Sequence, residues 1–498
     1  MDFLKKFFTA FFMMFVFGLM TASAKEAAVE IPKMPQMVYE LAEADNLDAA
    51  RSELIEGIKA FKESINLSRY NLTLEEYQLI ASNIVYDNPE LFYVSARSFP
   101  CSYIPSTKMV VEAKPVYLFE KEQAKAKKAF FEDEIQKAAS CAKDEMSDAE
   151  KVLSVHDYFC TEFSYDTTYE KYTPLELFET KSGVCQAYSI AFKAVMDKLK
   201  IECDYAVSEN MNHMWNIVKI DGKWYHVDVT WDDPLPDSAG RAMHNNFLVT
   251  DEGITAAGHY DFQMKYTVSD TEFENAFWSE AKSKIPYYNG KWLFINQTEK
   301  TIEAYTYSSG VRESVYSFTD RWSVADKPGY FWSGVFSGLD VYGGEIYFNT
   351  PDKICKIDLN SNVQTVYSYE SGEKSIYGFK IACQKDGDYV FFELRRGAND
   401  EESEIKKTAI AKMSAKAAKS GDKYNITACF SSLAENKTAV FAVYNAKGKL
   451  IEVKTAKVEN GSTSASVLQS GAESIYVMCF GDLENIMPAV DMCRAVIE

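Results

Sequence analysis

The sequence has 498 residues, of which 47% are hydrophobic and 25% are charged. These values are typical of globular proteins, and the length exceeds what one hydrophobic core usually serves, so we expect several domains. The net charge of −20 at pH 7 argues against nucleic acid and anionic membrane surfaces as partners, because both attract positively charged patches.

The first 24 residues have the pattern of an export signal. Lys5 and Lys6 precede an apolar run from Phe7 to Leu19, and Ala22-Ser23-Ala24 matches a small-residue cleavage site. The apolar run is short for a membrane span, and no second long apolar run follows it. We therefore expect residues 1–24 to be a signal peptide, the mature protein to be secreted or held at the cell surface, and no transmembrane span to remain after cleavage.

Residues 25–145 read as a mainly helical, α+β region that packs on the domain following it. Helical spacing of apolar residues and a Thr-to-Glu capping-box pattern mark its helices, and two β-rich runs surround a Pro-Ser-Thr turn. The predicted elements are a helix after Asn46-Leu47-Asp48, a helix from Thr73 to before Asn88, strands over 94–103 and 109–117, and a helix over 120–141.

The stretch Ser182–Tyr188 places a cysteine at the predicted start of a helix. Apolar residues recur every three or four positions from Val184 to Leu199, so Cys185 is predicted to lie in the first turn. The N-terminus of a helix favours thiolate over thiol through its dipole and its unpaired N–H groups. The ten cysteines are too sparse for a disulfide scaffold and form no CxxC pair; Cys479 and Cys493 could pair, which the sequence leaves open.

Two β-rich runs on either side of Asp221-Gly222 predict a β-hairpin. A two-residue turn makes Ile220 oppose Lys223, so Trp215 would oppose Asp228 and His213 would oppose Thr230. His213 and Asp228 then lie on one face as diagonal neighbours, close enough for an imidazole and a carboxylate to meet. A slip of one residue would separate them.

Cys185, His213 and Asp228 follow the order of a thiol nucleophile, its base and the group that orients the base. Spacing alone leaves a second interpretation equally open, a structural hairpin with a satisfied histidine and an aspartate near a turn.

Three blocks of sequence stand in a characteristic order: Gly183-Val184-Cys185-Gln186-Ala187-Tyr188, His213-Met214-Trp215-Asn216 and Asp221–Pro234. Together they resemble the transglutaminase-like superfamily, specifically its bacterial exported branch, and Asp87–Tyr93 and His156-Asp157-Tyr158 resemble lead-in segments of that branch. The match covers roughly residues 45–275. The resemblance implies a papain-like α+β fold with Cys185 as nucleophile, His213 as base and Asp228 as orienting acid.

The other candidate residues carry weaker predictions. The backbone N–H of Cys185 is the natural oxyanion donor, and the second donor stays open between Tyr165 and Gln186. Trp215 and Trp231 could line a substrate groove or pack in the core. The remaining histidines receive no catalytic role, no metal site and no cofactor is predicted, and no EF-hand loop is present. We expect His156 to be a packed core residue, His226 to lie on the face opposite His213, and His244 and His259 to lack metal-ligand spacing.

The second half of the chain reads as all-β. Turn-plus-strand units recur at 288–295, 342–348 and 385–392, as in repeat-like β domains, and strands over 425–430, 439–444, 450–458 and 474–480 suggest a β-sandwich resembling modules of clostridial exported proteins. The fold class expected is therefore multidomain: a transglutaminase-like core with a helical N-terminal part, followed by all-β domains. The predicted domains are 1–24 (signal peptide), 25–145, 146–280 (catalytic core), 285–420 (β repeats) and 422–498 (β-sandwich).

The predicted function is exported, cysteine-dependent acyl transfer on peptide or protein amides through a thioester at Cys185, with protease or deamidase activity favoured over protein cross-linking. The partners expected are a peptide or protein substrate and, through the β domains, the cell surface or cell wall. The alternative is a catalytically silent surface adhesion protein that uses the same fold as a scaffold.

Overall fold

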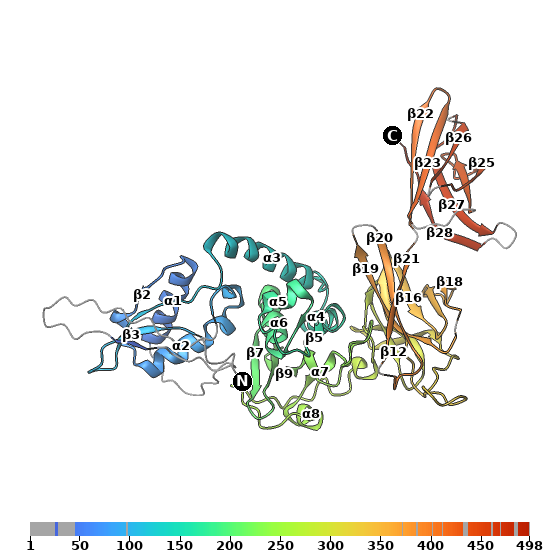
Figure 1. Cartoon of the computed structure of the whole chain (residues 1–498). Coiled ribbons are helices and arrows are strands. Elements are labelled where there is room, and N and C mark those ends of the chain that lie inside the picture. Colours follow the sequence, from blue (N-terminus) through green and yellow to red (C-terminus); the bar gives the residue numbers. More distant parts are fainter. Residues whose placement is uncertain are drawn as a thin grey trace. The chain divides into compact units, whose positions relative to one another are not determined.

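The fold is known from a computed structural model (Figure 1). The chain divides into two compact units, described separately below: residues 1–155, 165–230 and 247–271, and residues 156–164, 231–246 and 272–498. The predicted signal peptide lies outside the described residues, so export stays a prediction. Within the described part of the chain, no helix is long and apolar enough to cross a membrane. The structure describes residues 25–27, 45–95, 98–370, 372–384, 387–400, 402–410, 412–431, 437–459, 462–468, 470–482 and 487–497.

Among its described residues, the N-terminal part of the first unit contains three α-helices and a small sheet of order β1-β3-β4-β2. The predicted capping box is present, because the Thr73 side chain accepts from the Glu76 N–H and the Glu76 side chain accepts from the Thr73 N–H. The strands predicted over 94–103 and 109–117 are shorter than expected, because Pro100 and Pro115 lack the N–H that would extend the ladder. The elements are β1 (Lys25–Ala27), α1 (Asp45–Lys59), β2 (Ile65–Asn66), α2 (Leu74–Asp87), β3 (Cys101–Tyr103), β4 (Val110–Ala113) and α3 (Lys121–Ala139).

The rest of the first unit is built on an antiparallel sheet of order β10-β9-β8-β7, with helix α6 on it (Figure 1). Two buried hydrogen bonds join α6 to β8: Ser189 Oγ donates to the Met214 carbonyl over 3.1 Å, and Asn216 Nδ2 donates to the Ser189 carbonyl over 3.1 Å. The elements between residues 148 and 256, of which α4, β5 and α7 belong partly to the second unit, are α4 (Asp148–Glu162), β5 (Ser164–Tyr165), α5 (Pro174–Thr180), β6 (Ser182–Gly183), α6 (Cys185–Leu199), β7 (Cys203–Ser208), β8 (His213–Ile220), β9 (Lys223–Val227), α7 (Val229–Asp232), β10 (Phe247–Val249) and α8 (Asp251–Ala256).

The predicted hairpin register is confirmed next to its turn. Strands β8 and β9 pair from Ile220 with Lys223 through Asn216 with Val227, and the two turn residues both have positive φ, as a type I′ turn requires. The extension of that register is wrong, because β9 ends at Val227 and the chain turns into α7. His213 therefore pairs with Ser208 of β7, not with Thr230.

The second unit contains the all-β half of the chain, as predicted. Three antiparallel sheets follow one another in the sequence, and each contains one of the predicted turn-plus-strand units. Their strands are β11 (Tyr287–Tyr288), β12 (Lys291–Asn296), β13 (Thr301–Thr306) and β14 (Val311–Ser317); β15 (Leu339–Tyr342), β16 (Glu345–Asn349), β17 (Lys353–Ile357) and β18 (Val363–Ser368); and β19 (Ser375–Gln384), β20 (Gly387–Arg395) and β21 (Glu404–Ala409).

The C-terminal strands form two further sheets, of orders β26-β23-β22-β29 and β25-β24-β27-β28, which share one apolar core. Strand β22 was not predicted, because its Ala- and Lys-rich sequence lacks β-branched residues; its alanines Ala415 and Ala417 are buried on alternate positions. Cys479 and Cys493 both carry free thiols. The strands are β22 (Lys412–Ser420), β23 (Lys423–Ser431), β24 (Thr438–Tyr444), β25 (Leu450–Lys457), β26 (Ser462–Leu468), β27 (Ser474–Asp482), β28 (Met487–Arg494) and β29 (Val496–Ile497).

Candidate active site

Cys185 is the first residue of α6, as the sequence predicts. Val184 caps the helix in an extended conformation, which turns the chain sharply into the first turn. A side chain at Gly183 would come within 2.8 Å of the Ala187 Cβ, so this close approach requires glycine. Cys185 therefore stands at the positive end of the α6 dipole, where negative charge on sulfur is stabilised.

His213, the first residue of β8, is joined directly to Asp228, as the hairpin predicts. The His213 Nε2 lies 2.6 Å from Asp228 Oδ2, and both side chains are buried. With Nε2 committed to the carboxylate, Nδ1 is the ring nitrogen left for Cys185, whose side chain hydrogen bonds to His213. The structure thus brings the three predicted residues together.

The charges of these groups reinforce one another. Burial by itself lowers the pKa of His213, but the charge and hydrogen bond of Asp228 and the side chain of Cys185 raise that pKa to about 10. Burial favours the neutral form of Asp228, yet the His213 charge and two histidine hydrogen bonds hold the pKa of this carboxyl well below its usual range. The arrangement favours an imidazolium ring between an aspartate and the cysteine.

Asp228 has further donors that the sequence did not reveal. Oδ2 also accepts from His259 Nε2 over 2.8 Å, and Oδ1 accepts from the backbone N–H and the hydroxyl of Thr230 over 3.1 Å and 2.6 Å. An Asx-type spacing of two residues could have indicated Thr230. His259 stands 31 positions away and carried no local signal. These hydrogen bonds, together with the one from His213, hold the carboxylate in place.

The prediction for His226 is wrong. Since Ile217 pairs with His226, this histidine lies on the same face of the hairpin as His213 and Trp215. Trp215 Nε1 donates to His226 Nδ1 over 2.9 Å, and His226 Nε2 lies 2.9 Å from Asp251 Oδ1. Burial lowers the pKa of His226, so the neutral ring with its proton on Nε2 satisfies both contacts. Trp215 is buried in the core, whereas Trp231 is 43% exposed.

A small pocket of about 50 Å³ opens at Cys185. Both residues considered as the second oxyanion donor, Tyr165 and Gln186, line it. Burial and the nearby charge of Cys185 raise the pKa of Tyr165, so its hydroxyl keeps its proton and can donate. The other lining residues are Tyr169, Tyr172, Val184, Asn212 and Met214.

A second cysteine–histidine–aspartate set lies in α4. Cys160 Sγ is 3.8 Å from His156 Nε2, and His156 Nδ1 is 2.9 Å from Asp157 Oδ1. All three side chains are buried, His156 completely, as predicted for a core residue. Burial raises the pKa of Cys160 to about 12, so this thiol has neither the charge nor the access that a nucleophile needs.

Two groups of described residues have the composition of a metal site. One is His213, Asp228 and His259, and the other is His156, Asp157 and His244; in each group the ligand atoms lie within 4.8 Å of one another. In the first group His213 also contacts Cys185. The second group shares no residue with the site around Cys185.

Part of the chain is similar to known proteins. Residues 135–229 match the family model described as the transglutaminase-like superfamily. The kyphoscoliosis peptidase of Mus musculus is 23% identical in an alignment of 195 residues that covers 33% of this chain and 30% of that relative. The chain therefore spans less than a third of the length of this relative. A crystal structure of a TGase aligns with 24% of this chain and 41% of its own, at 16% identity and a TM-score of 0.20.

The matched residues include the start of α6, the whole of β8 and β9, and Asp228. The chain therefore carries a domain of the transglutaminase-like superfamily, followed by all-β sheets.

Proposed function

We propose that this protein is a cysteine-dependent acyl-transfer enzyme that acts on peptide or protein amides. Cys185 is the nucleophile, His213 exchanges protons with it and with the leaving group, and Asp228 orients His213. One observation carries the proposal: a cysteine at a helix N-terminus hydrogen bonds to a histidine whose other nitrogen lies 2.6 Å from a buried carboxylate. This combination supports a thiolate–imidazolium pair.

The reaction follows from these positions. The Cys185 thiolate adds to the amide carbonyl, and the resulting oxyanion accepts from the Cys185 N–H and from Tyr165 or Gln186. His213 gives its Nδ1 proton to the amine as the carbon–nitrogen bond breaks, which leaves a thioester on Cys185. An acceptor, water or an amine, then loses its proton to His213 and attacks the thioester, which releases the acyl group and the thiolate.

We favour water as the acceptor. The curated relative is named a peptidase, and this supports hydrolysis over cross-linking, although the shared region covers only part of each chain.

The test is mass spectrometry of the protein after incubation with a mixed peptide pool and a primary amine. The proposal expects an acyl adduct on Cys185, absent from Cys185→Ala, and cleaved or deamidated products. Cys141→Ala is the matched control, because Cys141 is more accessible than Cys185 and stands outside the site. Amine-coupled products would show that the acceptor is an amine and that the reaction is cross-linking. An unmodified Cys185 and an unchanged pool would overturn the proposal and favour the adhesion alternative.

We also propose that the enzyme works outside the cell, and that residues 285–420 and 422–498 serve attachment or spacing. The export pattern of residues 1–24 supports the location outside the cell. The role in attachment or spacing is supported by the position of the three proposed catalytic residues, Cys185, His213 and Asp228, which all precede the β half. Fractionation of cells that express the chain with and without residues 1–24 tests export. Binding of the β half to cell walls tests attachment.

A further inference from the structure

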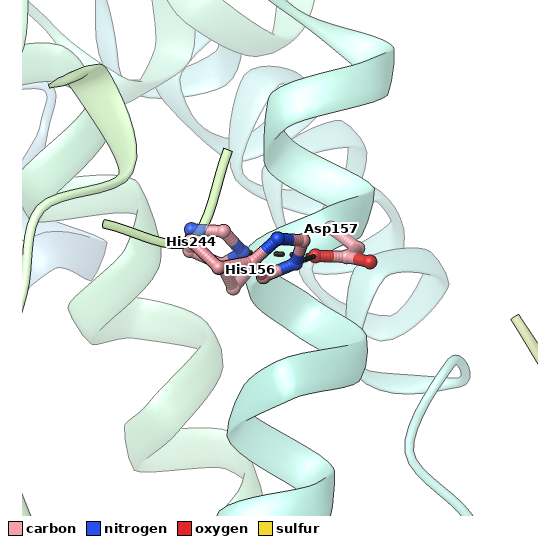
Figure 2. Close-up of side chains that lie close together, drawn as sticks. All are labelled: His156, Asp157 and His244. Carbon is pink, nitrogen blue, oxygen red and sulfur yellow. Dashed lines mark hydrogen bonds and ion pairs between the residues drawn. The ribbon is translucent and has the colours of Figure 1, made fainter. Parts of the chain in front are cut away.

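All five histidines of the chain are buried, and each contacts a carboxylate. His156 and His244 share one of them. Figure 2 shows both rings directed at Asp157: His156 Nδ1 and His244 Nε2 each lie 2.9 Å from Asp157 Oδ1. The three side chains have exposed fractions of 0–3%. Two imidazole nitrogens and one carboxylate oxygen thus converge on one point inside the second unit.

In each of these three side chains, one polar atom faces the point of convergence (the inner atom) and the other faces away from it (the outer atom). The outer atoms also have hydrogen-bond partners. His156 Nε2 lies 3.2 Å from Asp232 Oδ2, and His244 Nδ1 lies 3.3 Å from the Ala281 carbonyl. Asp157 Oδ2 accepts from the Ile285 N–H over 2.6 Å. Histidines that bind a metal ordinarily donate their other N–H to a carboxylate or a backbone carbonyl, and ligating carboxylates are themselves hydrogen bonded. Each of the three inner atoms therefore has the supporting partner that a metal ligand needs.

We propose that His156 Nδ1, His244 Nε2 and Asp157 Oδ1 bind a divalent transition-metal ion, zinc in the first place. Imidazole and carboxylate donors in this ratio suit zinc and its first-row neighbours better than calcium or magnesium, which take oxygen ligands. Metal binding by His156, Asp157 and His244 does not depend on acyl transfer at Cys185, so each proposal can be tested without the other.

The ligand separations are compatible with a bound ion. The ligand atoms lie within 4.8 Å of one another, and the two nitrogen–oxygen separations are 2.9 Å. Tetrahedral zinc with nitrogen and oxygen ligands holds them roughly 3.3 Å apart, so these two separations need to lengthen by only a fraction of an ångström. Three protein ligands leave a position for one water molecule.

Charge balance also permits the ion. Without a metal, each ring nitrogen of His156 and of His244 lies opposite an oxygen acceptor, so each of these contacts needs a proton. A Zn²⁺ ion between the ligand atoms would carry the same charge as the two protons that it displaces. The protonated network is the competing explanation, and it needs no metal.

Cys160 is not a ligand in this proposal. Its sulfur approaches His156 Nε2, the outer nitrogen, at 3.8 Å, and so lies on the Asp232 side of the ring. This distinction can be measured, because a thiolate bound to Co²⁺ gives an intense charge-transfer band that nitrogen and oxygen ligands do not.

The experiment is elemental analysis of tag-free, full-length protein from zinc-supplemented and from chelator-treated cultures. We grow cells under both conditions because the ligands are buried and a chelator reaches them slowly in the folded protein. The expected result is about one zinc ion per chain in the first preparation, a lower melting temperature in the second, and cobalt d–d bands without a thiolate band after growth in Co²⁺.

Two variants locate the ion. His244→Gln should reduce bound zinc at least about tenfold, whereas His259→Gln, a buried histidine on the other shared carboxylate, should retain it. If only His259→Gln lost zinc, the ion would have to be assigned to His213, Asp228 and His259 at the Cys185 site, and the proposal would be overturned. Metal-free protein from both cultures with equal melting temperatures would also overturn it, in favour of the protonated network. If His244→Gln does not fold, the wild-type metal content and cobalt spectrum still decide.

Discussion

His213 and His259 donate to the same oxygen of Asp228, over 2.6 Å and 2.8 Å. His259 packs edge-on against Trp215, with ring centroids 4.6 Å apart, and Trp215 stacks on His213. His259 therefore contacts two neighbours of His213: it donates to the Asp228 carboxylate, and it packs against the Trp215 ring. We regard His259 as a positioning residue, because it contacts Asp228 and Trp215, two neighbours of His213, and its ring lies beside the His213 ring with centroids 5.7 Å apart.

Replacement of His259 tests this relationship. His259→Phe removes a hydrogen bond to a buried charge, so we expect a loss of about 1.5–3 kcal/mol in the free energy of unfolding. We also expect about a tenfold slower alkylation of Cys185 by iodoacetamide. His259→Gln keeps a donor and should recover most of the alkylation rate. Equal rates in the two variants would show that the hydrogen bond does not position Asp228.

Replacement of Asp228 tests the source of the His213 charge. Asp228→Asn removes the carboxylate that raises the pKa of His213, so the ring should be neutral at pH 7 to 8. Acyl transfer should fall by at least about 100-fold, and the alkaline limb of its pH profile should move to lower pH. Steady-state rates from about pH 5 to pH 10 measure both effects. An unmoved alkaline limb would mean that another group controls it.

The His213–Asp228 pair also makes stability depend on pH. Because the folded pKa of His213, about 10, exceeds the unfolded value of 6.5, its stabilising contribution is complete below pH 6.5 and is lost as the pH rises through about 10. The difference in melting temperature between the wild type and His213→Gln should therefore be larger at about pH 6 than at about pH 10. Calorimetry at the two pH values checks this, and a constant difference would contradict it.

The turn that sets the hairpin register offers a backbone test. Gly222 has a φ of +82°, and a Cβ there would meet nothing within 4 Å, so Gly222→Ala should cost only the strain of the left-handed conformation, about 1–2 kcal/mol. Gly290→Ala is the matched control, because Gly290 has a φ of +79° and equally open surroundings. Both variants should lower the melting temperature. Only Gly222→Ala should slow alkylation of Cys185, since that hairpin carries His213 and leads to Asp228.

The contact between α6 and β8 can be tested at Ser189. Ser189→Ala leaves the buried Met214 carbonyl without the Ser189 donor, which should cost about 1 kcal/mol and slow alkylation, because Met214 adjoins His213. Ser82→Ala is the control: Ser82 is also buried, but its hydroxyl donates to the Gln78 carbonyl within α2. Comparable alkylation rates in the two variants would show that this hydrogen bond does not set the distance from Cys185 to His213.

The sequence by itself determined the parts of the site that local rules control. The apolar period from Val184 to Leu199 fixed the helix that starts at Cys185, since side chains three and four positions apart share one helix face. The turn at Asp221-Gly222 set the strand register, because both residues tolerate positive φ. That register brings Asp228 to the His213 end of β8, and the turn into α7 after Val227 completes the contact between them.

Tertiary structure decided the contacts between distant segments. Sequence spacing cannot bring His259 to Asp228, or His244 to Asp157, because the intervening chain passes through several elements before it returns. The end of β9 at Val227 likewise depends on the turn into α7, which replaced the predicted pairing of His213 with Thr230. Local periodicity and turn chemistry act over a few residues, whereas the shared carboxylates depend on packing of the whole fold.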